Sequence, residues 1–142
     1  MLEARGMEKR IINWADIWVL QAIQNCTKDG DFDLVQVIAI ADYINHAILA
    51  PEEFNNAVYK LKDNGLLHQS GDKLELTQKA QALFEKHENK SVHKLGSELQ
   101  KELNAVTYGP GYNPNILVVP EEFVSKAEFN NAIKEYQRKY GF

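Results

Sequence analysis

The sequence predicts a mainly α-helical fold with one small β-hairpin and a C-terminal helical extension. Two observations predict this fold. Apolar residues recur at intervals of three and four along most of the 142-residue chain, which is the spacing of amphipathic helices. Residues 66–69 and 73–76 instead predict two short strands around a turn at Gly71, as in a β-hairpin. We expect one domain over residues 11–90 and the extension over residues 91–142.

The composition is typical of a folded globular protein. Hydrophobic residues make up 44% of the chain and charged residues 25%, which argues against a disordered chain. No apolar run approaches the roughly 18 residues that a membrane-spanning helix needs, so we expect no membrane partner. The N-terminal residues lack the apolar segment of a signal peptide, and the single cysteine, Cys26, fits a reducing compartment. We therefore expect a cytoplasmic location.

Two apolar helices are expected first along the chain. The first covers residues 14–26 and begins after Asn13, a residue type that favours the N-cap position. Apolar residues lie on several sides of this helix, so we expect it at the centre of the core. The second helix covers residues 34–45 and begins after Asp33, which caps it in the same way.

A third helix is expected to begin at Pro51, because proline suits the first position of a helix. It ends at Asn64 and Gly65, a pair that favours a left-handed C-cap. The hairpin follows, and then a helix over residues 78–87 that begins after Thr77. The inward stripe of the third helix consists of Phe54, Ala57, Val58 and Leu61.

Two segments beside the hairpin carry a family resemblance. Residues 60–67 read KLKDNGLL and residues 74–80 read LELTQKA. They resemble the L-x-x-x-G-L-L/I and L-T-x-x-G/A segments on either side of the hairpin in the winged helix-turn-helix superfamily. Residues 42–48 also resemble a stretch in uncharacterised bacterial winged-helix proteins. The resemblance covers roughly residues 11–87, and it implies that residues 51–64 form the recognition helix and the hairpin the wing.

The resemblance implies sequence-specific DNA binding, as in transcriptional regulators of this superfamily. In that mechanism the third helix enters the major groove. Asparagine can pair with adenine through two hydrogen bonds, and lysine contacts phosphate. The hypothesis places Asn55, Asn56 and Tyr59 at the bases, and Lys60, Lys62 and Lys73 at the phosphates.

The charge of the first domain favours a second hypothesis. The formal net charge is −4, and residues 11–88 hold six basic and twelve acidic side chains. Glu52 and Glu53 begin the third helix, where they interact favourably with the helix dipole but repel DNA. The alternative is a winged-helix protein–protein interaction module without DNA binding. The sequence has no nucleophile elbow, metal-ligand cluster or Gly-rich cofactor loop, so we expect neither an enzyme nor a cofactor.

The C-terminal extension begins with a helix expected over residues 91–105. Its apolar residues step by three and four and form a narrow seam, of the kind that packs against another helix. This seam either joins a second copy of the chain in a homodimer or folds back on its own domain. The seam residues are Val92, Leu95, Leu99 and Leu103.

The rest of the extension combines a turn-rich segment, an extended piece and a helix. A stacking surface is one interpretation of Tyr108 and Tyr112 in the turn-rich segment, whose role the sequence does not assign. Residues 116–119 are expected to be extended, and a last helix over residues 126–139 begins after a capping box at Ser125.

Two short sequences occur twice. Glu-Phe-Asn-Asn-Ala is found at residues 53–57 and 128–132, and Pro-Glu-Glu-Phe at residues 51–54 and 120–123. No second hairpin sequence follows the second copies, so they do not indicate a duplicated domain. The repeats predict only two similar amphipathic helix starts.

Overall fold

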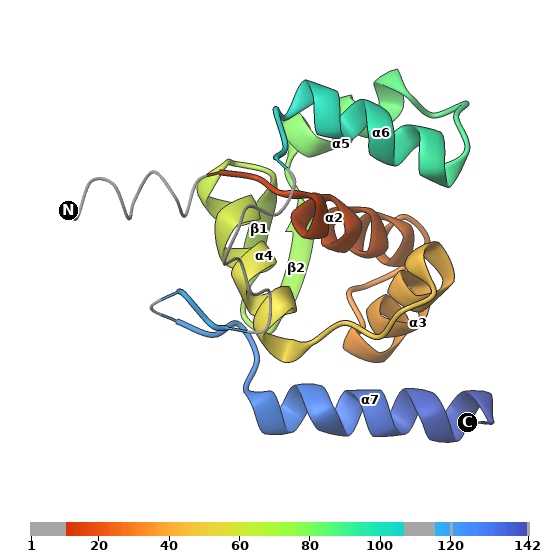
Figure 1. The fold of residues 1–142 in the computed structure, drawn as a ribbon, viewed down its shortest axis with the longest axis vertical. Helices are drawn as coiled ribbons and strands as arrows, with labels where there is room; N and C mark the ends of the chain where they lie inside the picture. Colours follow the sequence, from red (N-terminus) through yellow and green to blue (C-terminus); the bar gives the residue numbers. More distant parts are fainter. Residues whose placement is uncertain (1–10, 107–115, 120, 142) are drawn as a thin grey trace.

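A computed structural model of the chain describes residues 11–106, 116–119 and 121–141. These residues form six helices and one two-stranded antiparallel hairpin (Figure 1). The prediction of a mainly α-helical fold with a small β wing and a C-terminal helix is confirmed. The stacking surface predicted at Tyr108 and Tyr112 lies outside the described residues.

Three helices form the centre of the fold: α2 (Trp14–Thr27), α3 (Leu34–Asn45) and α4 (Pro51–Asp63). α2 packs against both of the others, and most of its residues are buried (Figure 1). Its N-terminus carries a capping box in which Asn13 and Asp16 exchange hydrogen bonds. The predicted central position of this helix is therefore confirmed, and its polar first turn lies inside the protein.

The hairpin follows α4 directly. Gly65, with φ at +73°, ends the helix, and β1 (Leu67–Ser70) then pairs with β2 (Lys73–Leu76). The turn between the strands needs Gly71, whose φ is +63°. Three helices followed by a hairpin after the third are compatible with a winged helix-turn-helix.

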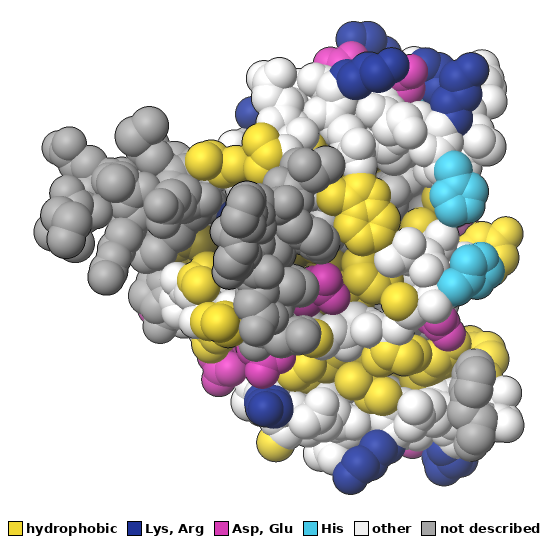
Figure 2. Space-filling model, viewed as in Figure 1, with side chains coloured by type: hydrophobic (Ala, Val, Ile, Leu, Met, Phe, Trp, Pro, Cys, Tyr) yellow, Lys and Arg dark blue, Asp and Glu magenta, His cyan; other side chains and the backbone are white. Residues whose placement is uncertain are grey.

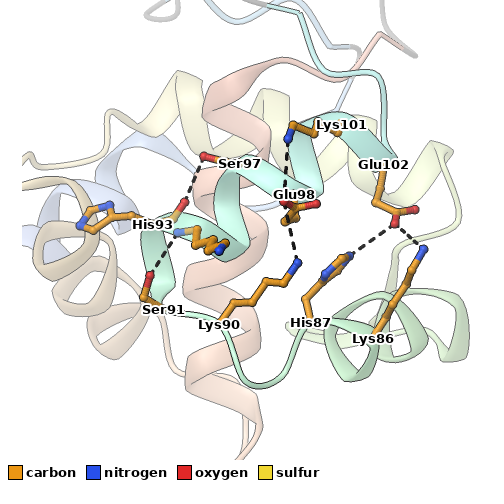
Figure 3. A network of polar contacts seen from close by, with 10 residues as sticks. Lys86, His87, Lys90, Ser91, His93, Ser97, Glu98, Lys101 and Glu102 are labelled. Atoms are coloured by element: carbon orange, nitrogen blue, oxygen red, sulfur yellow. Dashed lines mark hydrogen bonds and ion pairs between the residues drawn. The ribbon is translucent and has the colours of Figure 1, made fainter.

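Two further helices, α5 (Gln78–Lys86) and α6 (Val92–Glu102), lie at the top of Figure 1, where α6 packs against α2 and α5 against β2. Charged side chains join them (Figure 3). Glu102 accepts hydrogen bonds from Lys86 at 2.5 Å and from His87 at 3.4 Å. These partners lower the pKa of Glu102, the Lys86 hydrogen bond most of all. The polar network therefore holds the two helices against each other on the side away from α4.

The predicted seam of α6 packs against its own domain. Leu99 is fully buried, and Val92, Leu95 and Leu103 are partly buried against the core. The Gln21 side chain of α2 also donates a hydrogen bond to the Val92 carbonyl at 2.8 Å. The seam is thus occupied within the chain, and a homodimer through these four residues remains a prediction that the structure does not support.

The last helix, α7 (Lys126–Tyr140), lies across α3 and the start of α4 (Figure 1). Ser125 caps it as predicted, by accepting from the Glu128 amide at 3.1 Å. It buries Phe129, Ala132 and Tyr136 against the domain. In the part of the chain that the structure describes, no helix combines the length and apolar character that crossing a membrane requires.

Candidate interaction surface on helix α4

Helix α4 is covered on two sides. Its inward stripe packs in the core as predicted, with Phe54, Ala57 and Leu61 fully buried. A second side, at Asn55 and Asn56, is covered by residues 116–119 and 121–129, so that these two asparagines are only 1% and 5% exposed. In a DNA-reading helix this second side is the one that meets the major groove.

Asn55 and Asn56 hold the C-terminal segment by its backbone. The Asn55 side chain donates to the Val124 carbonyl at 2.9 Å and accepts from the Val124 amide at 3.0 Å. The Asn56 side chain donates to the Ile116 carbonyl at 2.8 Å and accepts from the Val118 amide at 3.0 Å. Each side-chain amide thus pairs with one N–H and one C=O, as a neighbouring β-strand does.

Aromatic rings hold the same segment to α4. The Phe54 ring lies with its centroid 5.4 Å from Phe129 and 6.1 Å from Phe123. Phe123 also meets Phe32, from the segment before α3, edge to face at 5.7 Å. Such pairs add to the stabilisation from buried area. Phe54, Phe123 and Phe129 are the phenylalanines of the repeated sequences, so the repeats bring like residues together in one cluster.

Lys60 lies in the core and not at a surface. Its Nζ pairs with Asp16 Oδ2 at 2.7 Å, and the two side chains are 8% and 2% exposed. Burial raises the pKa of Asp16, and the Lys60 ammonium opposes that shift. Burial also raises the pKa of Glu53. Lys60 therefore compensates a buried carboxylate, and the structure leaves it no surface at which to meet a phosphate.

The other predicted DNA contacts lie at the surface. Tyr59 and Lys62 line a groove of about 310 Å³ between α4, β1 and the C-terminal segment, which also contributes Glu121 and Glu122. Lys62 donates to the Gln69 side chain at 2.6 Å. Lys73 is paired with Asp31 at 3.1 Å. The groove beside α4 is therefore lined by acidic as well as basic side chains.

Basic side chains gather away from α4. On the face drawn in Figure 2, Lys and Arg side chains lie over α5 and α6 at the top and along α7 at the bottom. Of the α7 residues, Lys126 is 3.7 Å from Glu52, and Arg138 is paired with Glu135. The basic side chains seen on this face therefore belong to α5, α6 and α7.

One side-chain contact ties α7 to α3. The Tyr136 hydroxyl donates to Asp42 Oδ2 at 2.6 Å. This hydrogen bond is the main reason that the pKa of Tyr136 is raised to about 12. The neutral hydroxyl is the form that the folded protein favours, and it lies where α7 crosses the end of α3.

Alkaline pH is expected to weaken this contact selectively. A raised pKa means that the stabilisation from Tyr136 is complete below its ordinary pKa of 10.0 and is lost as the pH rises through about 12. The free energy of unfolding of Tyr136→Phe should therefore fall below that of the wild type at about pH 9, and the difference should shrink towards pH 12. Denaturant titrations of both chains at several pH values measure this difference in the free energy of unfolding. A difference that stays constant with pH would contradict the assignment.

Comparisons of this chain with protein-family models, with curated proteins and with solved structures found no match. Among the described side chains, no group of three or more His, Cys, Asp and Glu could hold a metal ion.

Proposed function

We propose that this chain is a winged helix-turn-helix protein that serves as a protein–protein interaction module in the cytoplasm. Its third helix holds an extended polypeptide segment in the place where related folds hold DNA. The observation that carries this proposal is the pairing of Asn55 and Asn56 with the backbone of residues 116–124. We propose no enzymatic role for these residues.

Charge supports the same function. Glu52 and Glu53 begin α4, and Glu121 and Glu122 lie beside it, whereas Lys60 is used inside the core. A backbone segment needs hydrogen-bond partners and apolar pockets, and α4 offers both through its asparagines and Phe54. DNA binding by Asn55 and Asn56 requires residues 116–119 and 121–129 to leave α4, which uncovers Phe54 to water.

A peptide titration tests the binding of extended segments. A labelled synthetic peptide with the sequence of residues 116–124 is expected to bind the full-length Phe123→Ala chain more tightly than the wild type. The reason is that the chain's own segment then competes less for α4. Adding Asn55→Ala to this variant should abolish peptide binding. Equal binding of the peptide to all three chains, or binding to none, would overturn the proposal.

A selection from genomic DNA fragments at low salt tests the alternative, a DNA-binding transcriptional regulator. Low salt is the most permissive condition because phosphate contacts weaken as salt rises. We expect the wild-type chain to enrich no fragment. Enrichment that disappears in Lys62→Ala/Lys73→Ala would instead establish DNA binding through the exposed lysines.

A further inference from the structure

Helices α2, α3 and α6 border a small pocket with a volume of about 200 Å³. Trp14 and Trp18 of α2 and Ile44 of α3 form its apolar walls. Residues of α6 complete it, among them Gly96 and His93, which Figure 3 labels. None of the described residues of α4, or of the segment that α4 holds, lines this pocket. The pocket is therefore separate from the site of the proposed function.

The Gln21 side chain places an unpaired acceptor at this pocket. Gln21 is only 3% exposed, and its Nε2 donates to the Val92 carbonyl at 2.8 Å, which fixes the orientation of the amide group. Its Oε1 faces Gly96, where an added Cβ atom would lie 3.0 Å away. No described residue donates to Oε1. This oxygen is also not enclosed, because His87 Nδ1 is the one enclosed side-chain atom without a partner among the described residues. Oε1 therefore lies at the surface of the pocket that Gln21 and Gly96 line.

The walls favour an aromatic ring. The rings of Trp14 and Trp18 lie 5.7 Å apart and are tilted, so they offer both faces and edges to a third ring. The Trp18 indole N–H already donates to the Ala41 carbonyl at 2.8 Å, which leaves its ring as an apolar surface. An apolar cavity of about 150 Å³ accepts benzene. A pocket of about 200 Å³ thus has room for one ring with a small substituent.

The lining also favours a ligand without charge. No Asp, Glu, Lys or Arg is among the described residues that line the pocket. A charged group that loses its water there finds no opposite charge to compensate it. Gln21 Oε1 instead favours a neutral hydrogen-bond donor, because an acceptor that loses its water without gaining a donor opposes binding.

We propose that this pocket binds a neutral molecule with one aromatic ring and one hydrogen-bond donor, as in phenol. The ring lies against Trp14 and Trp18, and the hydroxyl donates to Gln21 Oε1. Gly96 is needed for this contact, because a side chain at that position fills the space in front of Oε1.

A phenol titration of the full-length chain, followed by NMR, tests the proposal. The chain has two tryptophans and both line the pocket, so their indole N–H signals report on it directly. Both signals should shift and saturate with a Kd of about 1 mM, an affinity within reach of a ligand of this size. Toluene, in which a methyl group replaces the hydroxyl, should bind at least about tenfold more weakly because it leaves Oε1 unpaired.

Gly96→Ala tests the same contact from the side of the protein. Its methyl group would lie 3.0 Å from Gln21 Oε1, so phenol binding should weaken at least about tenfold. Alanine favours the helix more than glycine does, so α6 is expected to fold. Gly30→Ala is the matched control, because a Cβ atom there meets nothing within 4 Å, and it should bind phenol as the wild type does.

Four results would each overturn the proposal. They are indole shifts that do not saturate with phenol, equal binding of phenol and toluene, unchanged binding by Gly96→Ala, and an equal loss in Gly30→Ala. These results do not depend on the peptide titration or on the DNA selection.

Discussion

Lys60→Ala is expected to lower the free energy of unfolding by about 3–5 kcal/mol, the cost of removing one partner of a buried ion pair. The substitution leaves Asp16 buried without the ammonium that lies 2.7 Å from it. Asp16 also accepts from the Asn13 amide, so the start of α2 is affected as well. Denaturant titration of the purified chain measures the loss.

Lys62→Ala is the matched control for this prediction. Lys62 lies two residues further along the same helix and is exposed, so its replacement should change stability by less than about 0.5 kcal/mol. If Lys60→Ala is as stable as Lys62→Ala, the ion pair between Lys60 and Asp16 does not stabilise the fold. That result would contradict the buried structural role of Lys60 and restore it as a candidate phosphate contact.

Asn55→Ala is expected to destabilise the protein by about 1–3 kcal/mol, because it leaves the N–H and C=O of Val124 without their buried partners. Besides this lower free energy of unfolding, we expect a local effect, namely faster exchange of the amide protons in residues 121–124. Denaturant titration and hydrogen exchange measure the two effects.

Asn130→Ala provides a control within the repeated sequence. Asn130 has the same neighbours in Glu-Phe-Asn-Asn-Ala and follows a buried phenylalanine in the same way, but its side chain is exposed. Its replacement should change stability by less than about 0.5 kcal/mol. Similar losses in both variants would show that the effect of Asn55 comes from helix composition and not from its contact with Val124.

The sequence was sufficient to predict the elements of the fold. The inward stripe of α4 around Phe54, the turn at Gly71 and the cap at Ser125 follow from local rules of spacing and backbone conformation. The largest difference lies in α6, which begins at Val92 and ends at Glu102, three residues before the expected end. Asn104, with φ at +52°, lies just beyond that end.

The roles of the asparagines could not be predicted in the same way. Asn55 and Val124 are 69 residues apart, and spacing within a helix does not indicate which distant segment covers its outward side. Lys60 presents the same difficulty, because its partner, Asp16, belongs to another helix. Both residue types are common on exposed helix faces, so a surface role was the natural expectation.

The repeated sequences were the signal that could have found this contact. Phe54 and Phe129 hold the same position in the two copies of Glu-Phe-Asn-Asn-Ala, and their rings meet. Phe54 and Phe123 are likewise the ends of the two copies of Pro-Glu-Glu-Phe, and they also meet. Each copy places a phenylalanine on the apolar side of its segment, and these rings pack together in the core.

Hydrogen exchange of the wild-type chain in dilute solution tests the central claim most directly, namely that α4 holds the chain's own C-terminal segment. The Val118 and Val124 amides donate to Asn56 and Asn55, whereas Leu117 has no such partner among the described residues. Both valine amides should therefore exchange at least about a hundredfold more slowly than the Leu117 amide. Exchange of all three amides at the same fast rate would contradict the claim.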